Sequence, residues 1–184
     1  MRSILPFDEL NKFPSYLRNR FPSGKLLPSD EEDIIDEMLD LFLLAYATGH
    51  QVTMENLPSE WEPTLDDVMK TVDKKVAGKT WRERVEEYFA SGGSVDDLVR
   101  IVETEAHRIA NESALETAHM CGATSKTWLT MLDDKVRDTH YPLEGVTMAL
   151  DSDFYTWDGD HAPAPGLFTK AENNVNCRCE LSYR

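Results

Sequence analysis

The sequence predicts an α+β fold, in which a mostly helical N-terminal region precedes a small α+β C-terminal unit with short strands. Two observations support this prediction. Apolar residues recur at helical spacing from about residue 30 to a stop at Gly122. After Gly122 the pattern changes to short alternating segments, separated by a loop rich in proline and glycine, which is typical of strands and turns. A chain of 184 residues has room for one ordinary domain or a small domain with a helical extension.

Residues 1–29 are predicted to form an extended basic arm, with at most one short helix around 8–20. This segment holds four prolines, and its five Lys or Arg against two acidic residues give it a net charge of +3. Such a segment is expected to order on binding an acidic partner or DNA, and to make the main partner contact. A solvated tail with ordinary charges is the alternative.

Residues 30–93 are predicted to form a helical region. Its first helix is expected to begin behind an N-cap at Ser29 and to end at Gly49. Two shorter helices follow in the prediction, one from Leu65 to near Gly78 and one over about 80–91.

Residues 94–184 are predicted to form the C-terminal unit. Ser94 is expected to cap a long helix that stops at Gly122. Alternating or aromatic segments then predict short strands. These segments are 125–132, 154–157 and 177–183.

Composition and charge exclude several classes of protein. The net charge of −15 argues against binding of nucleic acid over a broad surface, because affinity for phosphate depends on Lys and Arg. No apolar run approaches the roughly 20 residues that span a bilayer, and the N-terminus has no pattern of a secretory signal. Three cysteines do not suggest a disulfide framework, so free thiols in a reducing compartment are expected.

Two of the three cysteines, Cys177 and Cys179, lie one residue apart near the C-terminus. On a strand they would share one face and supply half of a zinc site. His140 and His161 are candidate further ligands, and Asp133 or Cys121 is a candidate fourth. The simpler interpretation is that one or both thiols are small buried apolar groups.

Two catalytic alternatives use the same residues. A nucleophilic cysteine would need a base that lowers its pKa, and His140 is the best candidate for that role. A zinc nuclease would combine His140 with Asp133 and Asn176, although the C-terminal unit lacks the basic surface that an enzyme acting on DNA needs.

Polar residues in the segment "DDKVRDTHYPLEG" favour a structural role instead. Asp133, Arg137 and His140 would share one face of a helical turn, with Asp133 and Arg137 as an ion pair. The planar guanidinium of Arg137 also suits a loop carbonyl. Gly145 is typical of a turn, and Asn176 can cap a loop. Together with the cysteines, these residues are predicted to fasten a small, loop-rich fold.

The C-terminal half resembles a known family in the order of its motifs. These are "KTWLTMLDDKVRDTHYPLEG", an aromatic "FYTWDGD", a "PAPG" loop and the terminal "NVNCRCELSY". They are similar to the phage head-morphogenesis family, whose minor head protein domain is named for the F protein of phage Mu. The upstream "VETEAHRIANESALETAHMCGA" resembles the preceding helix of that family, so the resemblance covers about residues 98–184. The resemblance implies that the motif residues of the family correspond in this chain to Trp128, Asp133, Arg137, His140, Gly145, Asn176, Cys177, Arg178 and Cys179.

The resemblance implies a structural minor head protein of a tailed phage that acts in head morphogenesis, and it leaves open a part in DNA packaging or ejection. It implies portal or capsid proteins as partners, no membrane, and a place in the virion, at the head interior or portal vertex, after assembly in the host cytoplasm. It assigns no catalytic residue and no firm cofactor, with zinc left open. The alternative is a metal-dependent nuclease or toxin-like effector that uses His140, Cys177 and Cys179.

Overall fold

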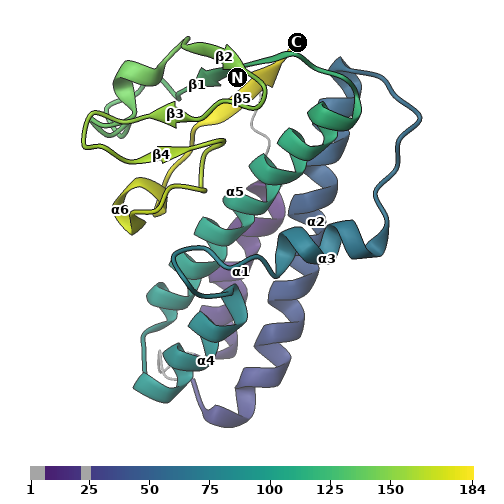
Figure 1. The fold of residues 1–184 in the computed structure, drawn as a ribbon. Coiled ribbons are helices and arrows are strands. Elements are labelled where there is room, and N and C mark those ends of the chain that lie inside the picture. The colour runs from purple at the N-terminus through teal and green to yellow at the C-terminus, as the bar shows by residue number, and fades with distance from the viewer. Residues whose placement is uncertain (1–6, 22–25) are drawn as a thin grey trace.

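The computed structural model describes residues 7–21 and 26–184, and it confirms the α+β class. Long helices form one part of the molecule, and a small unit of short strands lies beside one end of them (Figure 1). The helices are α1 (Phe7–Arg20), α2 (Glu31–Asn56), α3 (Leu65–Val72), α4 (Trp81–Ser91), α5 (Val95–Met120) and the short α6 (Ala171–Asn174). The strands are β1 (Ser125–Leu129), β2 (Thr147–Ala149), β3 (Phe154–Tyr155), β4 (His161–Ala162) and β5 (Glu180–Tyr183).

The helix starts follow from local capping. Ser94 accepts a hydrogen bond from the backbone N–H of Asp97, and the Asp97 carboxylate accepts one from the backbone N–H of Ser94. This reciprocal capping box is the predicted start of the long helix. Thr64 and Thr80 begin α3 and α4 in the same way. The predicted N-cap at Ser29 is wrong, because a 3-10 turn covers Pro28–Asp30 and Asp30 precedes α2.

The strands form two small antiparallel sheets. The three-stranded sheet has the order β2-β1-β5, with Trp128 opposite Leu181 in the β1–β5 pair. The two-stranded sheet is the β3–β4 pair, in which Phe154 lies opposite Ala162. The β3–β4 pair joins strands close in sequence, whereas β1 and β5 come from the two ends of the C-terminal unit and pair across it.

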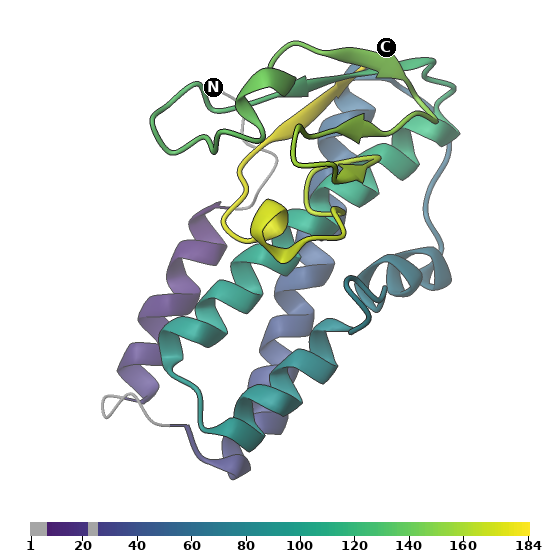
Figure 2. The ribbon, with the colours of Figure 1, turned by 60° about the vertical axis from the view of Figure 1, so that its left-hand side comes forward.

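Two apolar cores meet along α5. Its first half packs with α1, α2 and α4 in a core that includes Leu98, Val102 and Ile109. Its last turns contribute Leu115 and Ala118 to the core of the C-terminal unit. Figure 2 shows α1, α5 and α2 side by side, with the strands at the upper end of α5. Helix α5 therefore connects the helical region and the strand unit, and the division of the chain at residue 94 stays a prediction.

The short helix expected around residues 8–20 is present as α1, but the expectation that this segment does not pack on the core is wrong for the described residues. Residues 7–20 form α1, and Phe13 and Leu17 are buried in the helical core. Arg18 pairs with Asp96, and Arg20 pairs with Asp33 and Glu37. A deletion of residues 1–29 would therefore remove part of the core, not only a docking segment. Residues 1–6 and 22–25 of the predicted arm lie outside the described residues.

Gly49 does not end the first long helix, contrary to the prediction. Helix α2 continues through it to Asn56 because Gly49 faces the backbone of α5. A Cβ atom at position 49 would lie 2.1 Å from the carbonyl oxygen of Ala110. The missing side chain lets the two helices approach closely, and the sequence pattern alone does not distinguish this role from a helix stop.

Replacing Gly49 by alanine is expected to lower the free energy of unfolding by about 1–3 kcal/mol, because α2 and α5 must move apart. This net loss already includes the roughly 1 kcal/mol that alanine normally gains over glycine within a helix, because a contact of 2.1 Å with the backbone is too short for a side chain to relieve. Denaturant unfolding of the full chain checks the value. The control is Gln51→Ala, at an exposed position of the same helix. An equal or higher stability of the Gly49→Ala variant would contradict the close packing.

No helix in the described residues has the length and apolar character that a membrane span requires.

Candidate functional site

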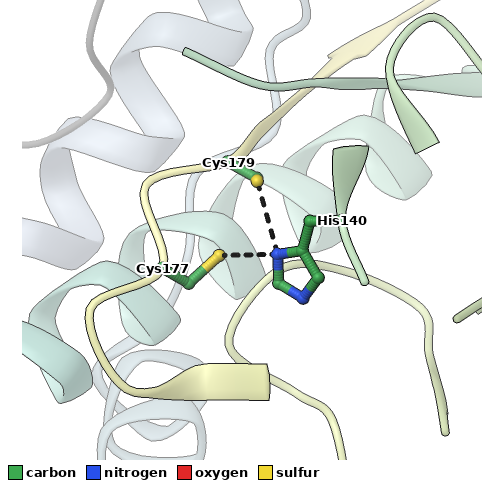
Figure 3. Close-up of side chains that lie close together, drawn as sticks. All are labelled: His140, Cys177 and Cys179. Atoms are coloured by element: carbon green, nitrogen blue, oxygen red, sulfur yellow. Dashed lines mark hydrogen bonds between the residues drawn. The ribbon is translucent and has the colours of Figure 1, made fainter. Parts of the chain in front are cut away.

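Three metal-ligating side chains meet in the C-terminal unit. The Nδ1 atom of His140 lies 3.6 Å from the sulfur of Cys177 and 3.6 Å from the sulfur of Cys179. Figure 3 shows both thiols directed at this one ring nitrogen. The three donor atoms lie within 4.8 Å of one another. We call these three residues the His140–Cys177–Cys179 triad.

The local backbone explains how the two cysteines reach the same nitrogen. Neither cysteine lies on β5, which begins at Glu180, so the predicted shared strand face is not the cause. Asn176 has a positive φ of 58°, and the N–H of Cys177 donates to the carbonyl of Asn174. This turn directs Cys177 at His140. Asparagine adopts such a conformation more easily than most residues.

Aromatic residues enclose the triad. The ring of His140 stacks on Phe168 at 5.2 Å and lies edge-on to Trp128 at 5.5 Å, both between ring centroids. His140 is 1% exposed, and Cys177 and Cys179 are 7% and 4% exposed. Among the described residues, Nε2 of His140 and Nε1 of Trp128 have no hydrogen-bond partner. The triad is thus a buried polar centre within an apolar core.

The two thiols are not equivalent. A hydrogen bond from Cys179 and another from His140 lower the pKa of Cys177 well below its usual value, despite burial. The same contact with Cys177, together with burial, raises the pKa of Cys179.

The tail that carries the cysteines is also held by the long helix. The carbonyl of Cys179 accepts a hydrogen bond from Nε2 of His107, at 2.8 Å. His107 is buried on α5, and desolvation lowers the pKa of its side chain, which favours the neutral form. Asn111 lies one turn further along and donates to the same Cys179 carbonyl, at 3.5 Å. These contacts connect the triad to α5.

The predicted ion pair between Asp133 and Arg137 is wrong. Residues 133–140 form turns and not a helix, so the i,i+4 geometry does not arise. Asp133 instead binds Arg178 through two hydrogen bonds of 2.6 and 2.8 Å, and the bond from Arg178 lowers the pKa of Asp133. Arg137 donates to the carbonyl of Val175. Both arginines therefore bind the 133–140 turns to the tail, as expected for fastening residues.

The remaining predicted residues have separate positions. Trp128 is fully buried on β1, and Gly145 has a φ of 73° and donates its N–H to the carbonyl of Trp128. His161 binds Asp153 at 2.7 Å. The sulfur of Cys121 lies 3.6 Å from that of Met54. Of the proposed zinc ligands, the described structure brings only His140, Cys177 and Cys179 together.

Sequence reasoning missed a second polar centre at Asp160. This carboxylate is 2% exposed and accepts five hydrogen bonds. Its donors are the backbone N–H groups of His161, Thr169 and Lys170 and the side chains of Thr169 and Asn173. The sequence offers one sign of this centre, an aspartate in a proline-rich loop that precedes "FTKAENN". Except for the adjacent His161, however, the hydrogen-bond donors lie nine to thirteen residues further along the chain.

Stability is expected to fall in acid as Asp160 becomes protonated. Burial raises the pKa of Asp160, but the hydrogen bonds from Thr169, Asn173 and Lys170 outweigh it and lower the pKa from 3.8 to about 2. Because the pKa is lower in the folded state, the ionised Asp160 contributes fully to the free energy of unfolding above about pH 4. This contribution is lost as the pH falls through about 2. Denaturant unfolding at a series of pH values measures the decline. A flat profile between pH 4 and pH 2 would contradict it.

The triad has little room for a reacting molecule. A cavity of about 10 Å³ adjoins it, lined in part by Arg137 and Asn176. That volume suits about one water molecule. A larger cavity of about 560 Å³ lies between α2 and the strands β1 and β5, and the triad does not line it. The arrangement can hold a small ion or fasten the fold, and the adjoining cavity is too small for a substrate molecule.

Comparisons with known proteins identify relatives of this chain. The sequence model described as "Phage Mu protein F like protein" matches residues 57–182. Over 90 residues the chain is 36% identical to the NAD(+)--arginine ADP-ribosyltransferase EFV of Enterococcus faecalis (strain ATCC 700802 / V583), covering 47% of this chain and 18% of that protein. Over 83 residues it is 31% identical to Minor head protein GP7 of Bacillus phage SPP1, covering 44% of this chain and 27% of that protein. The chain thus spans less than a third of either relative, and no solved structure gave a significant match.

Proposed function

Because the chain belongs to the Phage Mu protein F-like family of phage minor head proteins, we propose that it is a structural component of a tailed-phage head that acts in head morphogenesis. The observation that carries this proposal is the family match over residues 57–182, which includes the triad and all the other motif residues. The similarity to a minor head protein agrees with it. A part in DNA packaging or ejection is a further proposal.

The burial of the triad supports a structural role. His140, Cys177 and Cys179 lie beneath aromatic rings, and a catalytic group must be reached by its substrate. The contacts of Arg178 with Asp133 and of Arg137 with Val175 join the same two segments. These residues therefore maintain the shape of the C-terminal unit, which a head component needs for docking.

We infer that the partners are the portal protein, capsid proteins or both, and that the chain resides at the head interior or the portal vertex after assembly in the host cytoplasm. The described basic residues of α1 do not support the predicted docking on an acidic groove, because Arg18 and Arg20 already pair with acidic residues of this chain. Docking through the remainder of the chain surface is the revised expectation.

Comparing heads assembled with and without the portal protein tests this assignment of partners. Association with the portal predicts that the chain co-sediments with complete heads and is strongly depleted from heads that lack the portal. Equal amounts in both preparations would assign the contact to the capsid. Absence from both would contradict the proposed function.

The second candidate is an enzyme, either a metal-dependent nuclease or a toxin-like effector. The observation that favours it is the similarity to a protein named as an ADP-ribosyltransferase, although this covers only 18% of that protein. Assays of the purified chain for nuclease activity with divalent metals, and for ADP-ribose transfer from NAD+ to arginine, test it. Activity that His140→Gln removes while the variant stays folded would support the enzyme and count against a purely structural role.

A further inference from the structure

We propose that the His140–Cys177–Cys179 triad binds one Zn²⁺ ion through three protein ligands, with a water molecule as the fourth. This inference concerns the stability of the C-terminal unit and goes beyond the proposed role in the phage head. It depends on the geometry of the three donors, on their capacity for hydrogen bonds and on the cavity beside them.

The distances between the donors fit a tetrahedral zinc ion. Zinc binds cysteine sulfur at about 2.3 Å and histidine nitrogen at about 2.0–2.1 Å, so a tetrahedral angle places the two ligand atoms about 3.6 Å apart. His140 Nδ1 lies 3.6 Å from each of the two sulfurs. The same tetrahedral geometry places the two sulfur atoms about 3.8 Å apart. All three atoms lie within 4.8 Å of one another, which allows that distance.

Hydrogen bonding alone does not explain why both sulfurs face one nitrogen. Nδ1 of a histidine either donates one hydrogen or offers one lone pair, so it forms one good hydrogen bond in its plane. Cys177 and Cys179 both lie at the same distance from it. A cation at the centre of the three atoms satisfies all of them, because each directs a lone pair at the ion.

The charges also suit a buried zinc ion. Two thiolates and a neutral imidazole make a neutral complex with Zn²⁺, which avoids the cost of an unpaired charge in an apolar core. Arg137 and Arg178 line the same small cavity as the triad.

The cavity of about 10 Å³ provides the fourth position. The three ligands line it, and so does Arg137, whose buried Nη1 has no hydrogen-bond partner among the described residues. A water molecule on zinc would accept a hydrogen bond from this N–H group. Two other candidate ligands have different partners: Cys121 contacts Met54, and His107 binds the carbonyl of Cys179. The site therefore has three protein ligands.

Zinc at this position would hold two segments of the C-terminal unit together. His140 is the last residue of the 133–140 turns, while the cysteines lie in the tail before β5. The carbonyl of Cys179 in this tail binds His107 of α5. Loss of the metal is expected to loosen this tail and to expose the thiols, with little effect on the helical core.

Metal analysis of the full chain, purified under reducing conditions without chelators, tests the proposal. The expected result is about one zinc per chain. Cobalt(II) added to chelator-treated protein is expected to give sulfur-to-metal charge-transfer absorption and the intense visible bands of a tetrahedral site. His140→Gln and Cys177→Ser are expected to lose most of the bound zinc. The control is Cys121→Ser, which is expected to keep it.

The cobalt titration uses the wild-type chain, so it remains decisive if the variants fail to fold. A chain that contains no zinc and shows no thiolate–cobalt absorption after reduction would overturn the proposal. So would full retention of zinc by a folded Cys177→Ser variant. Neither measurement depends on head assembly, so failure here leaves the proposed function to its own test.

Discussion

Replacing Arg108 by alanine is expected to lower the free energy of unfolding by about 3–5 kcal/mol. The side chain is 1% exposed on α5 and binds four partners. It donates to the carboxylates of Glu105 and Glu112 at 2.7 and 2.9 Å, and to the carbonyls of Thr71 and Val72 at 2.9 and 3.0 Å. Its loss leaves Glu105 short of a partner in the core and removes the donor to the Val72 carbonyl at the end of α3, which is the costly way to break a buried ion pair.

Denaturant unfolding of the full chain measures this loss. The matched control is Arg100→Ala on the same helix, because the exposed pair of Arg100 with Asp97 contributes about 0–1 kcal/mol. Glu105 also pairs with Arg84, so part of its charge stays compensated. Adding Glu105→Gln to the Arg108→Ala variant is expected to restore part of the stability. A loss no larger than that of the control would contradict the importance of this network.

Replacing Asp160 by alanine is expected to lower the free energy of unfolding by about 3 kcal/mol. Five hydrogen bonds converge on this buried carboxylate, and of their donors the Asn173 amide also reaches Asp158, at 3.3 Å. Hydrogen bonds to a charged group are worth more than neutral ones, and the donors left behind lose their partner within the fold. The loop around Thr169 and α6 is therefore expected to open.

The same variant provides a check on the acid titration. If Asp160 causes the decline in stability between about pH 4 and pH 2, the Asp160→Ala variant should have a flatter profile in that range. The control is Asp151→Ala, at a highly exposed carboxylate that faces His119, with an expected change of at most about 1 kcal/mol. An Asp160→Ala variant as stable as this control would show that the hydrogen bonds around Asp160 contribute little.

Periodicity and capping predicted which segments are helical better than they predicted where the helices end. The capping box at Ser94 and the stop near Gly122 give the start and end of α5 within two residues. The contacts between α2 and α5 were not predictable, because a glycine that permits close approach and a glycine that ends a helix are identical in sequence. The packing of α1 was also missed. The prolines and charges of this segment favoured an extended arm, whereas in the structure Phe13 and Leu17 pack in the helical core.

The candidate site was predictable in its members and not in its contacts. The motif resemblance placed His140, Cys177 and Cys179 in one set, and the structure brings them together. The pairing of Asp133 with Arg178 joins residues 45 positions apart, whereas sequence reasoning favours local pairs such as Asp133 with Arg137. His107 was missed because a histidine within a helical stripe gives no sign of the distant carbonyl that it binds.

The most direct test of the proposed function is to measure this chain in heads purified by density gradient from cells that produce the phage. Quantitative mass spectrometry, with the major capsid protein as internal reference, gives its number of copies per head. A structural minor head protein predicts a low and reproducible copy number that persists through washing at high salt. Absence of the chain from washed heads, while it is abundant in the same lysate, would contradict the account.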